Sequence, residues 1–203
     1  MSQYIELPTM DVRNWLAGAA RECGYPTDEA NALGWTAWWL ENRGCKGVLH
    51  ASVYLLGIHG TPYDQLLQRA QGDDVVALCP IAMATLLTAA HWQKAFDFSD
   101  WAHGLQTAHP MMAAAALTKL LDYEYNVHLR YLDTHVILGE EGVAILSESL
   151  ATFGVVDASG IEIAIRLVKR AEEAVDFTFT YAKHETLRVP AYRYLEGGGF
   201  RFD

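Results

Sequence analysis

The hydrophobic pattern of this chain changes at Asp122, and the change limits the folds that the chain can adopt. Before Asp122, apolar residues recur mainly at the helical spacing of three and four positions. After it, apolar and polar residues alternate, as in residues 125–131 and 161–167. Helices followed by alternating strands predict an α+β fold, in which an N-terminal helical half packs against a C-terminal antiparallel sheet with one solvated face.

Capping and stop residues define the expected helices of the first half. Thr9 and Thr27 are the expected N-caps of the first two helices, and Gly24 and Gly44 are their expected ends. A short strand is expected at residues 75–78. The expected helices cover residues 9–24, 27–43, 48–56, 61–70, 80–95 and 111–121, with one further turn at 99–101.

The second helix carries Trp35, Trp38 and Trp39 at positions i, i+3 and i+4. This spacing places the three indole rings on one helix face. Such a bulky apolar face is either part of the core or an interface between subunits. The second alternative predicts a homo-oligomer.

The second half is expected to form strands at residues 125–131, 135–138, 143–146 and 161–167. A four-residue loop from Gly139 to Gly142 joins two of them, and its glycines allow positive φ angles. Residues 171–188 fit both a strand and a helix pattern, and we favour the helix. The glycine-rich end predicts no regular structure. Without repeats or linkers, the chain is expected to be one domain over 1–203, helical at 9–121, sheet-rich at 122–170, and ending in a helix and tail at 171–203.

Composition and charge exclude several classes of protein. The net charge of −10 and the pI of about 5.2 argue against nucleic-acid binding, which needs a basic surface. The three cysteines lack the spacing of a disulfide framework or zinc site, so a reducing cytoplasm is expected. No apolar run approaches the roughly 20 residues of a membrane-spanning helix.

Two helices begin with the same local pattern, a polar side chain followed by proline. Cys79 precedes Pro80 and His109 precedes Pro110, so each polar residue is an expected N-cap. A helix start favours an anion and therefore lowers the pKa of a thiol. Cys79 and His109 are accordingly the candidate catalytic residues, as a thiolate–imidazolium pair. The alternatives are a structural buried cysteine and two helices that lie apart.

Arginines and tyrosines supply the candidate groups for binding a substrate. Arg130, Arg188 and Arg193 have the geometry to hold a carboxylate through paired hydrogen bonds. Tyr192 adds a hydroxyl donor, and Gly198 belongs to a glycine-rich segment of the kind that closes over pockets. The alternatives are surface salt bridges for the arginines and a tail that packs on a neighbouring subunit.

Motifs for metals and cofactors are missing from the sequence. No phosphate-binding loop, dinucleotide-binding fingerprint or hydrolase nucleophile motif occurs, so no cofactor is expected. The eight histidines form no HxxxH or HExxH motif, so no metal site is expected, unless folding brings three of them together.

Short motifs along nearly the whole chain resemble a bacterial family that is catalogued as a domain of unknown function. The motifs are Cys79-Pro80, Ala108-His109-Pro110 and Val189-Pro190-Ala191. The first two expected helices are also similar, through Ala19-Ala20, Gly24-Tyr25, Glu29-Ala30 and Arg43-Gly44. The chain departs at its end, where Tyr192-Arg193 and a run of three glycines replace Ser-Arg and alternating Gly-Ala-Gly. The resemblance implies one folded unit of bacterial origin and no particular activity.

Residues 12–55 are also similar to the N-terminal helices of the malate/L-lactate dehydrogenase family that is distinct from the Rossmann type. The likeness lies in Gly24, Asp28, Ala30, Gly44 and His50. In that family a Ser-His-Gly sequence follows the second helix and serves the active site. Here the corresponding residues are Leu49-His50-Ala51. The similarity therefore implies related helices and not the dehydrogenase activity.

Two functions are compatible with these observations. The first is a small enzyme that acts on an anionic, carboxylate-bearing metabolite, with Cys79 and His109 near the reacting atoms and the arginines holding the substrate. The second is a non-catalytic binding or oligomerisation protein, in which the tryptophan-rich helices and the aromatic tail form the interface. The first predicts a convergent site, and the second predicts inert thiols.

Overall fold

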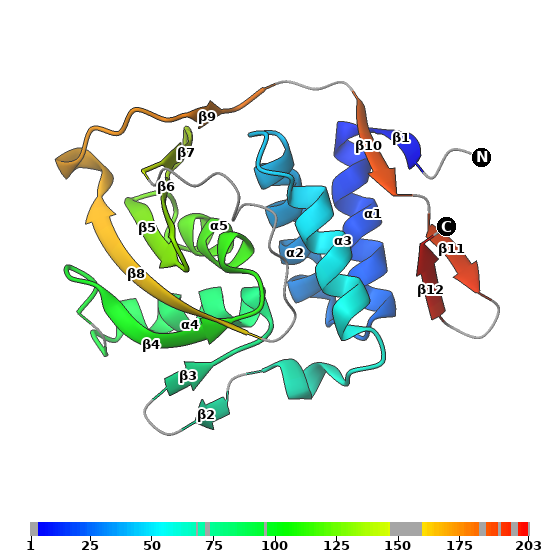
Figure 1. The fold of residues 1–203 in the computed structure, drawn as a ribbon, viewed down its shortest axis with the longest axis horizontal. Coiled ribbons are helices and arrows are strands. Elements are labelled where there is room, and N and C mark those ends of the chain that lie inside the picture. The colour runs from blue at the N-terminus through cyan, green and yellow to red at the C-terminus, as the bar shows by residue number, and fades with distance from the viewer. Residues whose placement is uncertain are drawn as a thin grey trace.

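The computed structural model describes residues 4–67, 69–71, 74–95, 97–146, 160–182, 186–190, 192–195 and 199–202 and shows an α+β fold (Figure 1). The helices lie mostly in the first half of the chain, as predicted, and the sheet draws mostly on the second. Helix α5 lies between the sheet and α2, and contacts both. The core is therefore formed where the helical half meets one face of the sheet.

Five of the predicted helices are confirmed. They are α1 (Thr9–Glu22), α2 (Thr27–Glu41), α3 (Gly47–Ile58), α4 (Pro80–Trp92) and α5 (Pro110–Leu120). Pro8 and Pro26, rather than the threonines that follow them, occupy the N-cap positions of α1 and α2. Trp35 and Trp39 are buried in the core, which supports the core interpretation of the tryptophan face.

The main sheet has eight strands in the order β2-β3-β4-β8-β5-β6-β7-β9. Their bounds are β2 Arg69–Gln71, β3 Asp74–Val76, β4 Ala102–Thr107, β5 Tyr125–Tyr131, β6 Thr134–Leu138, β7 Gly142–Ile145, β8 Ile161–Lys169 and β9 Phe179–Thr180. The pairs are antiparallel except β3 with β4, which are parallel. The parallel pair follows from α4, which crosses over between these two strands.

Two small antiparallel pairs complete the described structure. Strand β1 (Tyr4–Pro8) pairs with β10 (Thr186–Pro190), and both contact α1. Strand β11 (Tyr192–Leu195) pairs with β12 (Gly199–Phe202). Regular structure in this glycine-rich end corrects our prediction of none, because alternate aromatic residues on both sides of the glycines favour short strands that pair with each other.

The two faces of the central strands differ in chemistry. Val127 and Leu129 of β5 and Ile163 and Ile165 of β8 are fully or almost fully buried in the core, on the side of α5. Because side chains alternate along a strand, the residues between them belong to the opposite face, which we call the outer face. The outer face of β5 carries Asn126, His128 and Arg130, and that of β8 carries Ala164 and Arg166.

Two predictions in the first half were wrong. Residues 61–70 form a short 3-10 helix at Tyr63–Leu66 and then β2, instead of one helix, because the chain turns to pair with β3. The turn at residues 99–101 leads into β4, which we did not predict. A register shift between Ala102 and Leu105 interrupts the alternation there, so the strand pattern is hidden.

The predicted helix at 171–188 is also wrong. A 3-10 turn at Arg170–Glu172 is followed by extended chain and by β9. Gly139 and Gly142 explain this, since a Cβ at Gly139 would lie 2.7 Å from the Phe177 ring and one at Gly142 would lie 2.1 Å from the Phe179 carbonyl oxygen. Neither glycine adopts the positive φ that its lack of a side chain allows; each instead leaves room for the chain that crosses the hairpin.

In the part of the chain that the structure describes, no helix is both long enough and apolar enough to cross a membrane.

Candidate functional site

Cys79 occupies the N-cap of α4, as predicted. Its Sγ accepts a hydrogen bond from the Ala82 backbone N–H at 3.4 Å and one from the Tyr25 hydroxyl at 3.3 Å. The hydroxyls of Tyr54 and Tyr63 lie close enough to this sulfur for its charge to raise their pKa values. The side chain has no exposed surface. Cys79 is thus a buried sulfur surrounded by hydrogen-bond donors.

His109 lies in the same buried cluster. It is the N-cap of α5, and its ring packs edge-on against Tyr54 at 5.0 Å and against His50 at 6.0 Å between ring centroids. Tyr54 is therefore in contact with both predicted catalytic residues. The two proline-led helix starts converge on one cluster, and Tyr54 joins them.

The electrostatics of Cys79 correct one expectation. Burial raises the pKa of its thiol above the ordinary value, and the hydrogen bonds from Tyr25 and from the first turn of α4 oppose this only in part. We expected the helix start to lower this pKa. A protonated thiol without exposed surface is not ready to attack a substrate, so the catalytic role of Cys79 and His109 stays a prediction.

Of the other predicted site residues, three lie in the two small strand pairs. Arg188 of β10 is opposite Glu6 of β1, and Tyr192 and Arg193 belong to β11. Gly198 lies outside the described residues. Strand β10 contacts α1 (Figure 1), and the substrate-binding role of these residues stays a prediction.

A second polar group lies on the outer face of the sheet. It combines β5, β6 and β8 with a residue before β4 and one from the segment after β8. We call it the outer-face cluster. Its members are Trp101, Asn126, His128, Arg130, His135, Arg166 and Glu173.

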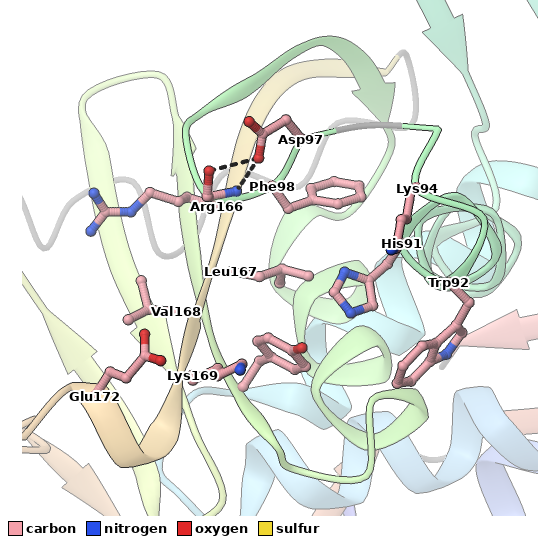
Figure 2. A pocket seen from close by; sticks show the side chains of 12 residues that line it. His91, Trp92, Lys94, Asp97, Phe98, Arg166, Leu167, Val168, Lys169 and Glu172 are labelled. Atoms are coloured by element: carbon pink, nitrogen blue, oxygen red, sulfur yellow. Dashed lines mark hydrogen bonds between the residues drawn. The ribbon is translucent and has the colours of Figure 1, made fainter.

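Two arginines share one tryptophan ring in this cluster. The guanidinium carbon of Arg130 is 3.9 Å from the centroid of the Trp101 ring, and that of Arg166 is 5.6 Å from it. Arg166 also borders a cavity of about 770 Å³ between the end of α4 and β8. Figure 2 shows its guanidinium directed away from His91, which lies across that cavity. Among the described residues, neither guanidinium forms an ion pair.

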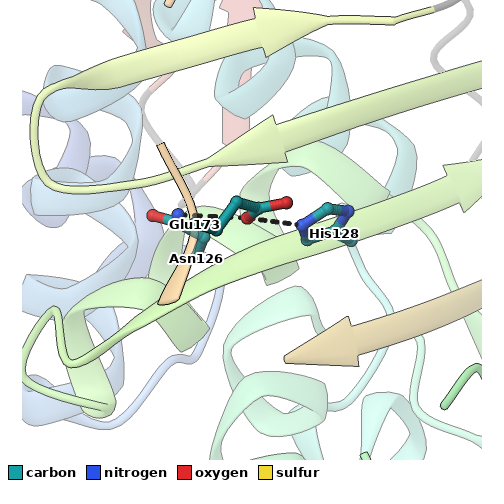
Figure 3. A network of polar contacts seen from close by, with 3 residues as sticks. All are labelled: Asn126, His128 and Glu173. Carbon is teal, nitrogen blue, oxygen red and sulfur yellow. Dashed lines mark hydrogen bonds and ion pairs between the residues drawn. The ribbon is translucent and has the colours of Figure 1, made fainter. Parts of the chain in front are cut away.

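A histidine and a carboxylate form the other half of the cluster (Figure 3). His128 Nε2 lies 2.8 Å from Glu173 Oε2, and the Asn126 side-chain amide donates to the same oxygen at 3.1 Å. Burial lowers the pKa of His128, the charges of Arg166 and Arg130 lower it further, and Glu173 opposes them. His128 is therefore neutral at pH 7, with its Nε2–H donated to Glu173.

Several buried polar atoms of the cluster lack a hydrogen-bond partner within the described residues. They are Asn126 Oδ1, His128 Nδ1 and Arg166 Nε. Buried polar atoms without a partner are rare in folded proteins, and a bound ligand or water commonly supplies what is missing. Within the part of the chain that the structure describes, the cluster thus combines two arginines that form no ion pair, a neutral imidazole held by a carboxylate, and unused hydrogen-bonding capacity.

A metal centre is not indicated in the described parts of the chain, where no three histidine, cysteine or acidic side chains are grouped for metal binding. Comparison with known proteins adds no identification. No family model, curated protein or solved structure matches this chain. Both family resemblances therefore stay predictions, and the function must be inferred from the geometry alone.

The sequence indicated Arg130 as a candidate carboxylate ligand but not its neighbours in the cluster. The available signal was the presence of His128 and Arg130 at alternate positions of a strand, on the face expected to be solvated. Trp101 and Glu173 come from separate segments, and Glu173 fell in the region wrongly predicted as helix. Their convergence on β5 follows only from the three-dimensional path of the chain.

The electrostatics of the cluster predict acid destabilisation. Burial and the charges of Arg130, His128 and Arg166 lower the pKa of His135 from 6.5 to about 4. Between these values the unfolded chain binds a proton that the folded protein does not, so stability falls as the pH drops from 6.5 to 4. After allowance for solvent screening, we expect His135 to contribute on the order of 1 kcal/mol to this loss.

Urea unfolding at a series of pH values measures this effect. In His135→Gln, the fall in unfolding free energy between pH 6.5 and 4 is expected to be smaller than in the wild-type protein. An identical pH dependence in the two proteins would show that His135 titrates normally in the folded state.

Proposed function

We propose that this chain binds a small organic anion, a carboxylate in the first instance, at the outer-face cluster, as an enzyme binds its substrate. One observation carries the proposal: two arginines lie over one tryptophan ring, and no described carboxylate forms an ion pair with either. The whole chain has a net charge of −10, so negative side chains to pair with them are abundant. Arginines left without counter-charges in an acidic protein favour an anionic ligand.

The chemistry of arginine supports a carboxylate or phosphate in particular. The planar guanidinium presents parallel N–H groups that match the two oxygens of such an anion. Packing of Arg130 on the Trp101 ring at 3.9 Å restrains this guanidinium before the ligand arrives, which lowers the entropy lost on binding. A hollow of about 320 Å³, lined in part by Arg130, His103, Glu162 and Ala164, gives a small molecule access to this face.

His128 is the group that we assign to proton transfer with the bound anion. Glu173 accepts the Nε2–H, so the lone pair of the neutral ring is on Nδ1, the atom without a partner among the described residues. An imidazole oriented by a carboxylate is the arrangement found in many general bases. Glu173 has a positioning role in this account, because it acts through His128.

Isothermal titration calorimetry with succinate, citrate and inorganic phosphate, at constant ionic strength, measures anion binding and tests the proposal. We expect saturable binding of at least one of these anions. Arg166→Gln and Arg130→Gln are each expected to weaken it by about 10- to 100-fold, because each removes a charge-assisted hydrogen bond. Repeating the titration in buffers of different ionisation enthalpy reports proton uptake, which we expect in the wild-type protein and not in His128→Gln.

Arg21→Gln is the matched control. It removes the same charge from an exposed position on α1, where Arg21 contacts only the side chain of Asn31 by hydrogen bonding among the described residues. Its affinity should stay within about twofold of the wild-type value, since a distant surface charge is screened by salt. Equal losses in Arg21→Gln and Arg166→Gln, or no saturable binding at all, would contradict the proposal.

A further inference from the structure

The cavity of about 770 Å³ shown in Figure 2 is bordered by Arg166, whose guanidinium is directed away from His91 on the opposite wall, and Arg130 does not line it. It exists because β4 begins at Ala102, opposite Ile165, so β8 continues to Lys169 without that neighbour. On this open side, Leu167 donates its backbone N–H to the Phe98 carbonyl oxygen at 2.9 Å. Helix α4 ends at Trp92 and supplies the opposite wall.

Aromatic rings gather around His91 on that wall. The centroid of the His91 ring lies 4.8 Å from that of Tyr125, 4.9 Å from that of Trp92 and 6.1 Å from that of Phe98. Burial lowers the pKa of His91, so the imidazole is neutral at pH 7 and behaves as a further flat ring. Phe98 is buried, whereas Trp92 is 59% exposed.

We propose that this cavity is a binding site for a planar aromatic molecule, which stacks on Trp92 and contacts His91 and Tyr125. The volume lies in the range of about 300 to 1,000 Å³ that is typical of small-molecule sites. The exposed indole of Trp92 offers a flat apolar surface at the edge of the cavity. Because the tryptophan side chain has few rotamers, little side-chain entropy is lost when a ligand ring stacks on it. Leu167 lies across the cavity from His91 (Figure 2) and adds an apolar surface.

The charged groups around the cavity favour an anionic substituent on that ring. Lys94, Lys169 and Arg166 line it, together with Asp97 and Glu172. The carboxylate of Asp97 is already engaged, because it accepts hydrogen bonds from the Ser99 N–H at 3.0 Å and from the Ser99 hydroxyl at 2.6 Å. Lys94 follows the end of α4 at φ 54°, a left-handed position where glycine is usual.

Binding of 8-anilinonaphthalene-1-sulfonate, a planar aromatic sulfonate, tests this site. We expect saturable binding to the native protein at one site, measured by probe fluorescence and by isothermal titration. Trp92→Ala is expected to weaken it about tenfold, since stacking on one exposed ring contributes roughly that factor. His91→Ala should also weaken it, and circular dichroism checks that both variants fold.

Two further variants separate this site from general surface binding and from the proposed anion site. Tyr181→Ala removes a ring that is 51% exposed and does not line the cavity, so the probe should bind it as it binds the wild-type protein. Arg130→Gln should also leave probe binding unchanged. Equal losses in Trp92→Ala and Tyr181→Ala, or binding without saturation, would overturn the aromatic site, and a loss confined to Arg130→Gln would place the probe at the outer-face cluster instead.

Discussion

Cys79 is expected to react with a thiol reagent at least about a hundredfold more slowly in the folded protein than in the unfolded chain. Its side chain has no exposed surface, and burial raises its pKa, so both access and the thiolate fraction are low. Reaction then requires local or global opening of the cluster that contains Tyr25 and Tyr54. This result would indicate that the donors around the sulfur stabilise the core and do not activate a nucleophile.

A variant with Cys23→Ser and Cys45→Ala isolates Cys79 for this measurement. Alkylation by iodoacetamide at pH 7.5 is followed by mass spectrometry, with and without denaturant. Cys23 in the wild-type protein gives an internal comparison, because it is only half-buried and its pKa is raised to about 11. Alkylation of folded Cys79 at the rate of the unfolded chain would contradict the burial argument and return Cys79 and His109 to the centre of the chemistry.

Gly34→Ala is expected to lower the free energy of unfolding by about 3 kcal/mol. A Cβ at this position on α2 would lie 2.3 Å from the Arg13 carbonyl oxygen and 3.0 Å from the Ala17 backbone nitrogen. Both contacts are backbone atoms of α1, so the two helices would have to separate. Urea denaturation measures the loss.

Gly18→Ala on α1 is the matched control. Its new Cβ would meet nothing closer than the end of the Arg21 side chain at 3.9 Å. Because alanine is the better helix former, this substitution should raise the unfolding free energy by about 0.5 to 1 kcal/mol. Similar effects of the two substitutions would show that α1 and α2 do not approach as closely as the structure indicates.

The helices and strands that were predicted correctly are those whose position is set by a signal in their own residues. Proline at the first turn marked the starts of α4 and α5, and regular alternation located β5 and β8. Elements that depend on distant partners were missed. The pattern of residues 171–188 fits both a helix and a strand, and only the close approach of Phe177 and Phe179 to the hairpin glycines shows that this segment is extended.

The same division applies to the candidate sites. The matching starts of two helices suggested a shared site for Cys79 and His109 as one of two alternatives, and Tyr54 lies next to both residues. The members of the outer-face cluster could not be predicted together, because no local sequence pattern shows which distant segments meet. Trp101 and Glu173 reach His128 only because β4 and β8 lie side by side and the chain after β8 crosses the sheet.

An NMR titration of the ¹⁵N-labelled protein tests anion binding at the outer-face cluster most directly. As succinate, citrate or phosphate is added at constant ionic strength, we predict progressive, saturating shifts of the Trp101 indole N–H and of the Arg130 and Arg166 Nε–H signals, assigned with the arginine variants. The signals of Arg21 should stay in place. Absence of shifts at Trp101, or shifts concentrated at Arg188 and Arg193 instead, would contradict the proposed site.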